Sequence, residues 1–140
     1  MMKKALLAIS ALALLGATQA EEPERNPGEQ VLCIGAFLYL AQLQAETCHA
    51  GKDPEYQARL KSYRDRLDAY LIRNFPNGEA DLVRFKERQG LSSPAEKRIC
   101  NLGKDYDFYG HWRELEAEKV DGMVDSLLER DGPPTFGDCV

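Results

Sequence analysis

The sequence predicts an all-α fold, a small disulfide-braced bundle of four to five helices. Strand signals are scarce, because β-branched residues are few and no segment alternates apolar and polar residues for long. Helix start and stop signals, by contrast, recur along the whole chain. The chain also has four cysteines, an even number that predicts two covalent braces in an oxidising compartment.

Residues 1–20 have the pattern of a secretory signal peptide, with cleavage after Ala20. Lys3 and Lys4 form the charged start, and residues 5–16 form the apolar core. This core is shorter than the roughly 20 residues that a permanent membrane span needs. We therefore expect a periplasmic or secreted protein without a stable membrane anchor.

The mature chain, residues 21–140, is expected to form a single acidic domain. Loss of Lys3 and Lys4 with the signal peptide changes the formal net charge from −5 to −7. Nucleic-acid binding depends on basic patches, so this charge excludes nucleic acid as the expected partner. It favours a basic protein partner instead. The sequence leaves the oligomeric state open.

The first two helices are expected over residues 28–48 and 53–74. The first is apolar nearly all round, which predicts a position at the centre of the bundle. Its expected buried side consists of Ile34, Phe37, Leu38, Ala41 and Ala45. The second has Asp53 as N-cap and Pro54 at its first position. Its apolar stripe is the clearest periodicity in the chain and consists of Tyr56, Leu60, Tyr63, Leu67, Tyr70 and Leu71.

A third helix, residues 79–89, is expected to bury three apolar side chains, namely Leu82, Val83 and Phe85. A fourth, residues 93–102, opens with a capping box in which Ser93 is the N-cap, Pro94 follows it and Glu96 reaches back. Gly103 is expected to end that helix.

The last expected helix covers residues 105–130, and a tail, residues 131–140, follows it. Four residues form its expected buried stripe: Trp112, Leu115, Met123 and Leu127. Gly110 and Gly122 weaken this helix by about 1 kcal/mol each, so a kink near Gly110 is compatible with the sequence.

The first helix carries two of the four cysteines, Cys33 and Cys48. Cys48 lies fifteen residue steps after Cys33, which is about 22 Å along a helix, so the two cannot bond to each other. Antiparallel packing of helices joined by short loops brings Cys100 to the end where Cys48 lies. We therefore prefer the pairs Cys48–Cys100 and Cys33–Cys139 over the alternative, Cys33–Cys100 and Cys48–Cys139.

The segment "KDYDFYGHWRELE", residues 104–116, is the densest candidate for a functional site. Asp107 and His111 would share one helix face, where a carboxylate can orient an imidazole for acid–base catalysis. These two residues are the catalytic candidates of a small periplasmic hydrolase, although no serine lies in a nucleophile motif. The binding candidates are aromatic residues of kinds enriched at binding hot spots: Tyr106, Tyr109 and Trp112.

No metal site and no cofactor are expected. The chain has two histidines, His49 and His111, and lacks HExxH and CxxCH motifs. His49 is interpreted as a residue at a helix C-terminus, where the helix dipole favours it. Either histidine together with Met123 could ligate haem, which gives a ligand or haem carrier as a further alternative.

The leading functional expectation is a non-enzymatic periplasmic binding or inhibitor protein that acts on another protein. It follows from an exported, braced helical scaffold that has no complete catalytic constellation. In build, the chain resembles small periplasmic inhibitors, toxin-neutralising immunity proteins and stress chaperones, although no motif carries this resemblance.

Overall fold

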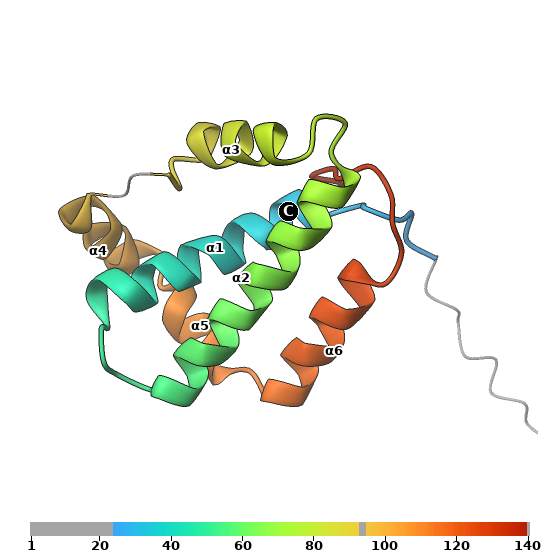
Figure 1. The fold of residues 1–140 in the computed structure, drawn as a ribbon. Helices are drawn as coiled ribbons and strands as arrows, with labels where there is room; N and C mark the ends of the chain where they lie inside the picture. Colours follow the sequence, from blue (N-terminus) through green and yellow to red (C-terminus); the bar gives the residue numbers. More distant parts are fainter. Residues whose placement is uncertain (1–23, 93–94, 140) are drawn as a thin grey trace, which may run out of the picture.

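The computed structural model describes residues 24–92 and 95–139, and these residues form helices without any strand (Figure 1). The all-α prediction is therefore confirmed. The predicted signal peptide, residues 1–20, lies outside the described residues, as do Ser93 and Pro94. The prediction of Ser93 as N-cap of the fourth helix is wrong, because that helix begins at Glu96 with Ala95 as its N-cap. The six helices are α1 (Val31–Cys48), α2 (Pro54–Asn74), α3 (Glu79–Arg88), α4 (Glu96–Asp105), α5 (Phe108–Glu114) and α6 (Ala117–Leu128).

Helix α1 is the central helix, because it packs against α2, α4 and α5. By length and composition it could also span a membrane, and its burial in the bundle accounts for that apolar composition. At Gly35 a Cβ atom would come within 2.8 Å of Leu67 Cδ2, so the glycine allows α1 and α2 to approach closely. The prediction that Phe37 is buried is wrong. Its ring is 40% exposed, because the neighbouring helices leave this strip of α1 open.

The apolar stripe of α2 is confirmed, and its tyrosines also connect α2 to later parts of the chain. Tyr63 and Tyr70 are buried, while Tyr56 is half-buried. The Tyr56 hydroxyl donates to the Tyr109 carbonyl in α5 at 2.7 Å. Tyr63 donates to the Asp121 carboxylate in α6. Tyr70 donates to the Arg130 carbonyl after α6 at 3.0 Å.

The single helix expected over residues 105–130 is wrong, because α5 and α6 are separate helices. The break lies at Leu115, where the backbone is extended (φ −76°, ψ 144°), rather than at Gly110. Helix α5 packs against α1 whereas α6 packs against α2, and one straight helix could not do both (Figure 1). The break leaves Leu115 41% exposed, contrary to expectation.

Two smaller predictions in the second half are also wrong. Val83 is 48% exposed, because only one face of α3 packs against the core. The buried residues of that helix are Leu82 and Phe85. Gly103 does not end α4, which continues to Asp105. A Cβ atom at Gly103 would lie 3.4 Å from Gln44 Nε2, so this glycine lies where α4 contacts α1.

The disulfides have the preferred pairing. Cys48–Cys100 joins α1 to α4 with a Cα–Cα distance of 5.6 Å, and Cys33–Cys139 joins α1 to the tail at 6.0 Å. Two backbone hydrogen bonds also hold the tail. Leu32 N–H donates to the Thr135 carbonyl at 3.1 Å, and Thr135 N–H donates to the Gly28 carbonyl at 3.0 Å. The tail is therefore strapped to the start of α1.

Candidate functional site

A shallow hollow of about 410 Å³ opens on the surface where α5 begins. Phe37 of α1 lines one side of it. The other lining residues belong to the α4–α5 turn and to α5, and they are Tyr106, Asp107, Phe108, His111 and Trp112. We call these six residues the aromatic hollow. It contains Tyr106 and Trp112, two of the three binding candidates from the sequence.

Three of the rings in the aromatic hollow form a stacked row. The Phe37 and Phe108 centroids lie 5.3 Å apart with planes at 16°, and those of Phe108 and Tyr106 lie 6.4 Å apart with planes at 15°. The two outer rings remain accessible, Phe37 at 40% and Tyr106 at 61%. Adjacent exposed aromatic rings of this kind are typical of an interaction surface.

Gln44 of α1 fixes the turn that carries these rings. Its side chain is buried, and its Oε1 accepts a hydrogen bond from Tyr109 N–H at 2.9 Å. Its Nε2 donates to the Tyr106 carbonyl at 3.0 Å. Asp107 lies between these two points and caps α5, because its Oδ1 accepts from Gly110 N–H at 2.8 Å. Hydrogen bonds to Gln44 of α1 thus hold the turn at Tyr106 and at Tyr109, and the Asp107 cap joins it to α5.

Tyr109, the third binding candidate, is buried and does not line the aromatic hollow. The residue is only 3% exposed, and its ring stacks on His49 with centroids 4.1 Å apart. Its hydroxyl donates to Asp53 Oδ2 at 2.6 Å. Burial, followed by this bond to the Asp53 carboxylate, raises the pKa of Tyr109. Tyr109 therefore fixes α5 against the loop between α1 and α2.

Asp53 occupies the N-cap position of α2, as predicted, but its side chain does not cap the helix. Its backbone is left-handed, with φ 46°, and its carboxylate binds the Tyr109 hydroxyl and Arg113, the latter at 3.1 Å. The prediction of a capping side chain is thus wrong. The role of Gln44 was missed, although a glutamine in an apolar helix was the available signal.

The two catalytic candidates do not form a hydrogen-bonded pair in the described structure. The Asp107 carboxylate binds Gly110 N–H, and His111 is exposed with its backbone N–H bonded to the Asp107 carbonyl at 2.9 Å. The only hydroxyl among the lining residues of the aromatic hollow is that of Tyr106. This geometry gives a hydrolase neither an oriented imidazole nor an aliphatic hydroxyl nucleophile.

Two further observations concern metal-ligating side chains and space in the core. The described residues contain no group of three or more metal-ligating side chains. One hollow in the core has a volume of about 20 Å³, and its lining includes Tyr63, Trp112 and Val120. Ligand pockets are typically about 300–1,000 Å³, so this space is too small for a haem or a comparable ligand.

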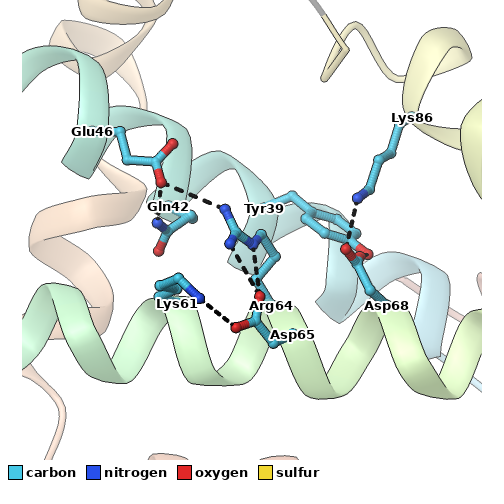
Figure 2. A network of polar contacts seen from close by, with 8 residues as sticks. All are labelled: Tyr39, Gln42, Glu46, Lys61, Arg64, Asp65, Asp68 and Lys86. Carbon is cyan, nitrogen blue, oxygen red and sulfur yellow. Dashed lines mark hydrogen bonds and ion pairs between the residues drawn. The ribbon is translucent and has the colours of Figure 1, made fainter.

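A polar network connects α1, α2 and α3 away from the aromatic hollow (Figure 2). Tyr39 donates to the Asp68 carboxylate, which also pairs with Lys86 at 3.0 Å. The Lys86 ammonium lies 4.7 Å from the centroid of the Tyr39 ring. Burial, with the nearby Asp68 carboxylate, raises the pKa of Tyr39. These groups satisfy one another, which is typical of structural support.

In comparisons with family models, with curated proteins and with solved structures, nothing matches this chain. The geometry of the aromatic hollow is therefore the basis for assigning a function.

Proposed function

We propose that the protein is an exported, non-enzymatic binding or inhibitor protein that contacts another protein through the aromatic hollow. The observation that carries this proposal is the stacked row of Phe37, Phe108 and Tyr106 on a turn fixed by Gln44. Rings that are already held in place lose little conformational entropy on binding. They are therefore suited to anchor a partner.

The hollow is best understood as the centre of a larger contact. Stable protein interfaces bury about 800 Å² on each partner, and a few central aromatic residues contribute most of the binding free energy. Phe37 and Tyr106 would be these central residues, with the polar residues of α5 at the rim.

Export is the second part of the proposal. The pattern of residues 1–20 supports a cleaved signal peptide. The two disulfides fit the same view, since structural disulfides form and persist in oxidising compartments. We propose the periplasm as the compartment and Ala20 as the last residue removed. Intact mass spectrometry of protein recovered from the producing cell should give the mass of residues 21–140 with both disulfides formed.

Site-specific photo-crosslinking tests the binding surface. A benzophenone amino acid would replace Phe37 in one variant and Ile72 in a control, since their exposed fractions, 40% and 42%, are nearly equal. We expect a discrete protein adduct from position 37 and none from position 72. The same adducts from both positions, or none from position 37, would refute the proposal.

A further inference from the structure

We propose that the aromatic hollow binds an arginine side chain presented by a basic segment of the partner protein. This inference rests on the proposed function and adds the chemical feature that is recognised. It depends on two independent properties of the described residues: the carboxylates around the hollow and its exposed rings.

The first property is negative charge without a local counterion. Asp107 lines the hollow, and Asp105 directly precedes Tyr106 in the sequence. Both residues are exposed, and neither forms an ion pair among the described residues. Arg113 lies on α5, but its guanidinium pairs with Asp53 at 3.1 Å. Lys104 is the other lysine or arginine of residues 104–114 and is not among the lining residues, whereas His111 lines the hollow. The hollow therefore favours a cationic group.

The second property is the exposed ring of Tyr106. The residue is 61% exposed, and among the described aromatic rings Phe108 is the one that stacks on it, so much of the Tyr106 surface is accessible to a partner. A cation over the face of such a ring is attracted by the negative potential of the π system. The combination of an exposed ring and adjacent carboxylates distinguishes this hollow from a purely aliphatic docking surface.

Arginine fits these two properties better than lysine does. The guanidinium is planar and weakly hydrated, so it stacks on an aromatic ring and can still donate hydrogen bonds to a carboxylate at its edge. A lysine ammonium is a strongly hydrated point charge and gains less from a ring face. The expected arrangement is a guanidinium on Tyr106 with its edge toward Asp105 or Asp107.

Trp112 makes the proposal directly measurable, because it is the only tryptophan in the chain and it lines the hollow. The oxidised mature protein would be titrated with a short blocked glycine–arginine peptide while tryptophan fluorescence is recorded. Matched peptides with citrulline or lysine in place of arginine serve as controls. We expect a saturable change with arginine, weaker binding of the lysine peptide, and binding of the neutral citrulline peptide at least about five-fold weaker.

Three variants separate the contributions. Tyr106→Leu keeps an apolar side chain but removes the ring face, and it should weaken arginine binding about five-fold. Asp105→Asn should weaken binding and reduce its salt dependence. Phe136→Ala removes a ring that is 44% exposed on the distant tail, and it should leave binding unchanged. Circular dichroism would establish that each variant is folded.

Two results would overturn the inference: no saturable change with the arginine peptide, or equal affinity for its citrulline counterpart. Photo-crosslinking from position 37 distinguishes the two proposals. An adduct at position 37 without arginine preference would leave the binding function standing and remove arginine as the recognised group. If neither the adduct at position 37 nor the fluorescence change with the arginine peptide is observed, both proposals are refuted.

Discussion

The buried side chain of Gln44 holds the Tyr109 N–H at 2.9 Å and, through its other end, the Tyr106 carbonyl at 3.0 Å. One amide on α1 thus fixes the turn that presents the exposed ring of Tyr106. Gln42 lies on the same helix and is also buried, but its Oε1 has no hydrogen-bond partner among the described residues. Gln42 is therefore a matched control for substitutions at Gln44.

Replacement of Gln44 by Met should lower the free energy of unfolding by about 1–3 kcal/mol, because the buried Tyr109 N–H and the partly buried Tyr106 carbonyl both lose their partner. Gln42→Met should be close to neutral, since it removes a buried oxygen without a partner and a single bond to Glu46. Urea unfolding of both variants provides the measurement. Equal losses for the two would contradict the role given to Gln44.

Gly110 and Gly122 should respond oppositely to alanine. Gly122 is exposed within α6, and apart from the adjoining residues and backbone of its own helix no described atom lies within 4 Å of a Cβ placed there, so Gly122→Ala should stabilise the protein by about 1 kcal/mol. A Cβ at Gly110 would overlap the Asp107 carboxylate that caps α5. Loss of this cap should make Gly110→Ala destabilising by up to about 1 kcal/mol.

Thermal unfolding by circular dichroism would give both values for the glycine variants. A stabilising effect of Gly110→Ala would mean that the Asp107 cap contributes little to α5.

The two disulfides should have separable effects. The Cys48–Cys100 bond closes a span of 52 residues and the Cys33–Cys139 bond one of 106, which corresponds to about 4 and about 5 kcal/mol in the chain-entropy model. Paired serine substitutions should therefore cost similar amounts of stability. Only loss of Cys48–Cys100 should also change Trp112 fluorescence in the native state, because α4 leads directly into the aromatic hollow.

Limited proteolysis is the complementary measurement for the disulfide variants. Without Cys33–Cys139, the tail should be cleaved early while the hollow keeps its native fluorescence. Early cleavage of α4 in that variant would contradict the view that the tail is a separate strap.

Stability should decline at alkaline pH because of the buried tyrosines. Burial first, and then the bonds to Asp68 and Asp121, raise the pKa values of Tyr39 and Tyr63 above the ordinary value of 10.0. The folded state thus retains protons that the unfolded state releases, so this stability is complete below pH 10 and is lost above it. Urea midpoints measured across this range should fall as the pH rises.

A variant with Tyr39→Phe and Tyr63→Phe is the control for the alkaline decline. It should show a shallower fall in urea midpoint, since two of the groups responsible are gone. Tyrosine ionisation in the wild-type protein, followed by ultraviolet absorbance, should coincide with unfolding. Full ionisation of the folded protein near the ordinary pKa would contradict the prediction.

Features of this fold that depend on the geometry of a single helix could be predicted from the sequence. The stripe on α2 follows from helical periodicity, so the burial of Leu60 and Leu67 required no knowledge of their neighbours. The length of an unbroken helix excluded a bond between Cys33 and Cys48. Antiparallel packing of neighbouring helices then favoured the observed pairing over the one alternative.

Features that depend on contacts between distant segments could not be predicted in this way. Asp53 matches an N-cap pattern, yet its carboxylate binds Tyr109 and Arg113 far along the chain. The break at Leu115 follows from the different packing partners of α5 and α6 rather than from a helix-breaking residue. Of the candidate site, Tyr106 and Trp112 were identified, whereas Phe37 was assigned to the core.

The bond between Cys33 and Cys139 also determines how the domain bears mechanical load. It joins the first turn of α1 to the end of the tail across 106 residues. A pulling force on the two ends of the chain would pass along the segment before Cys33, through the sulfur bridge and out at Cys139. The helices inside this covalent ring would carry none of that force, so the folded domain should resist extension until the bridge is reduced.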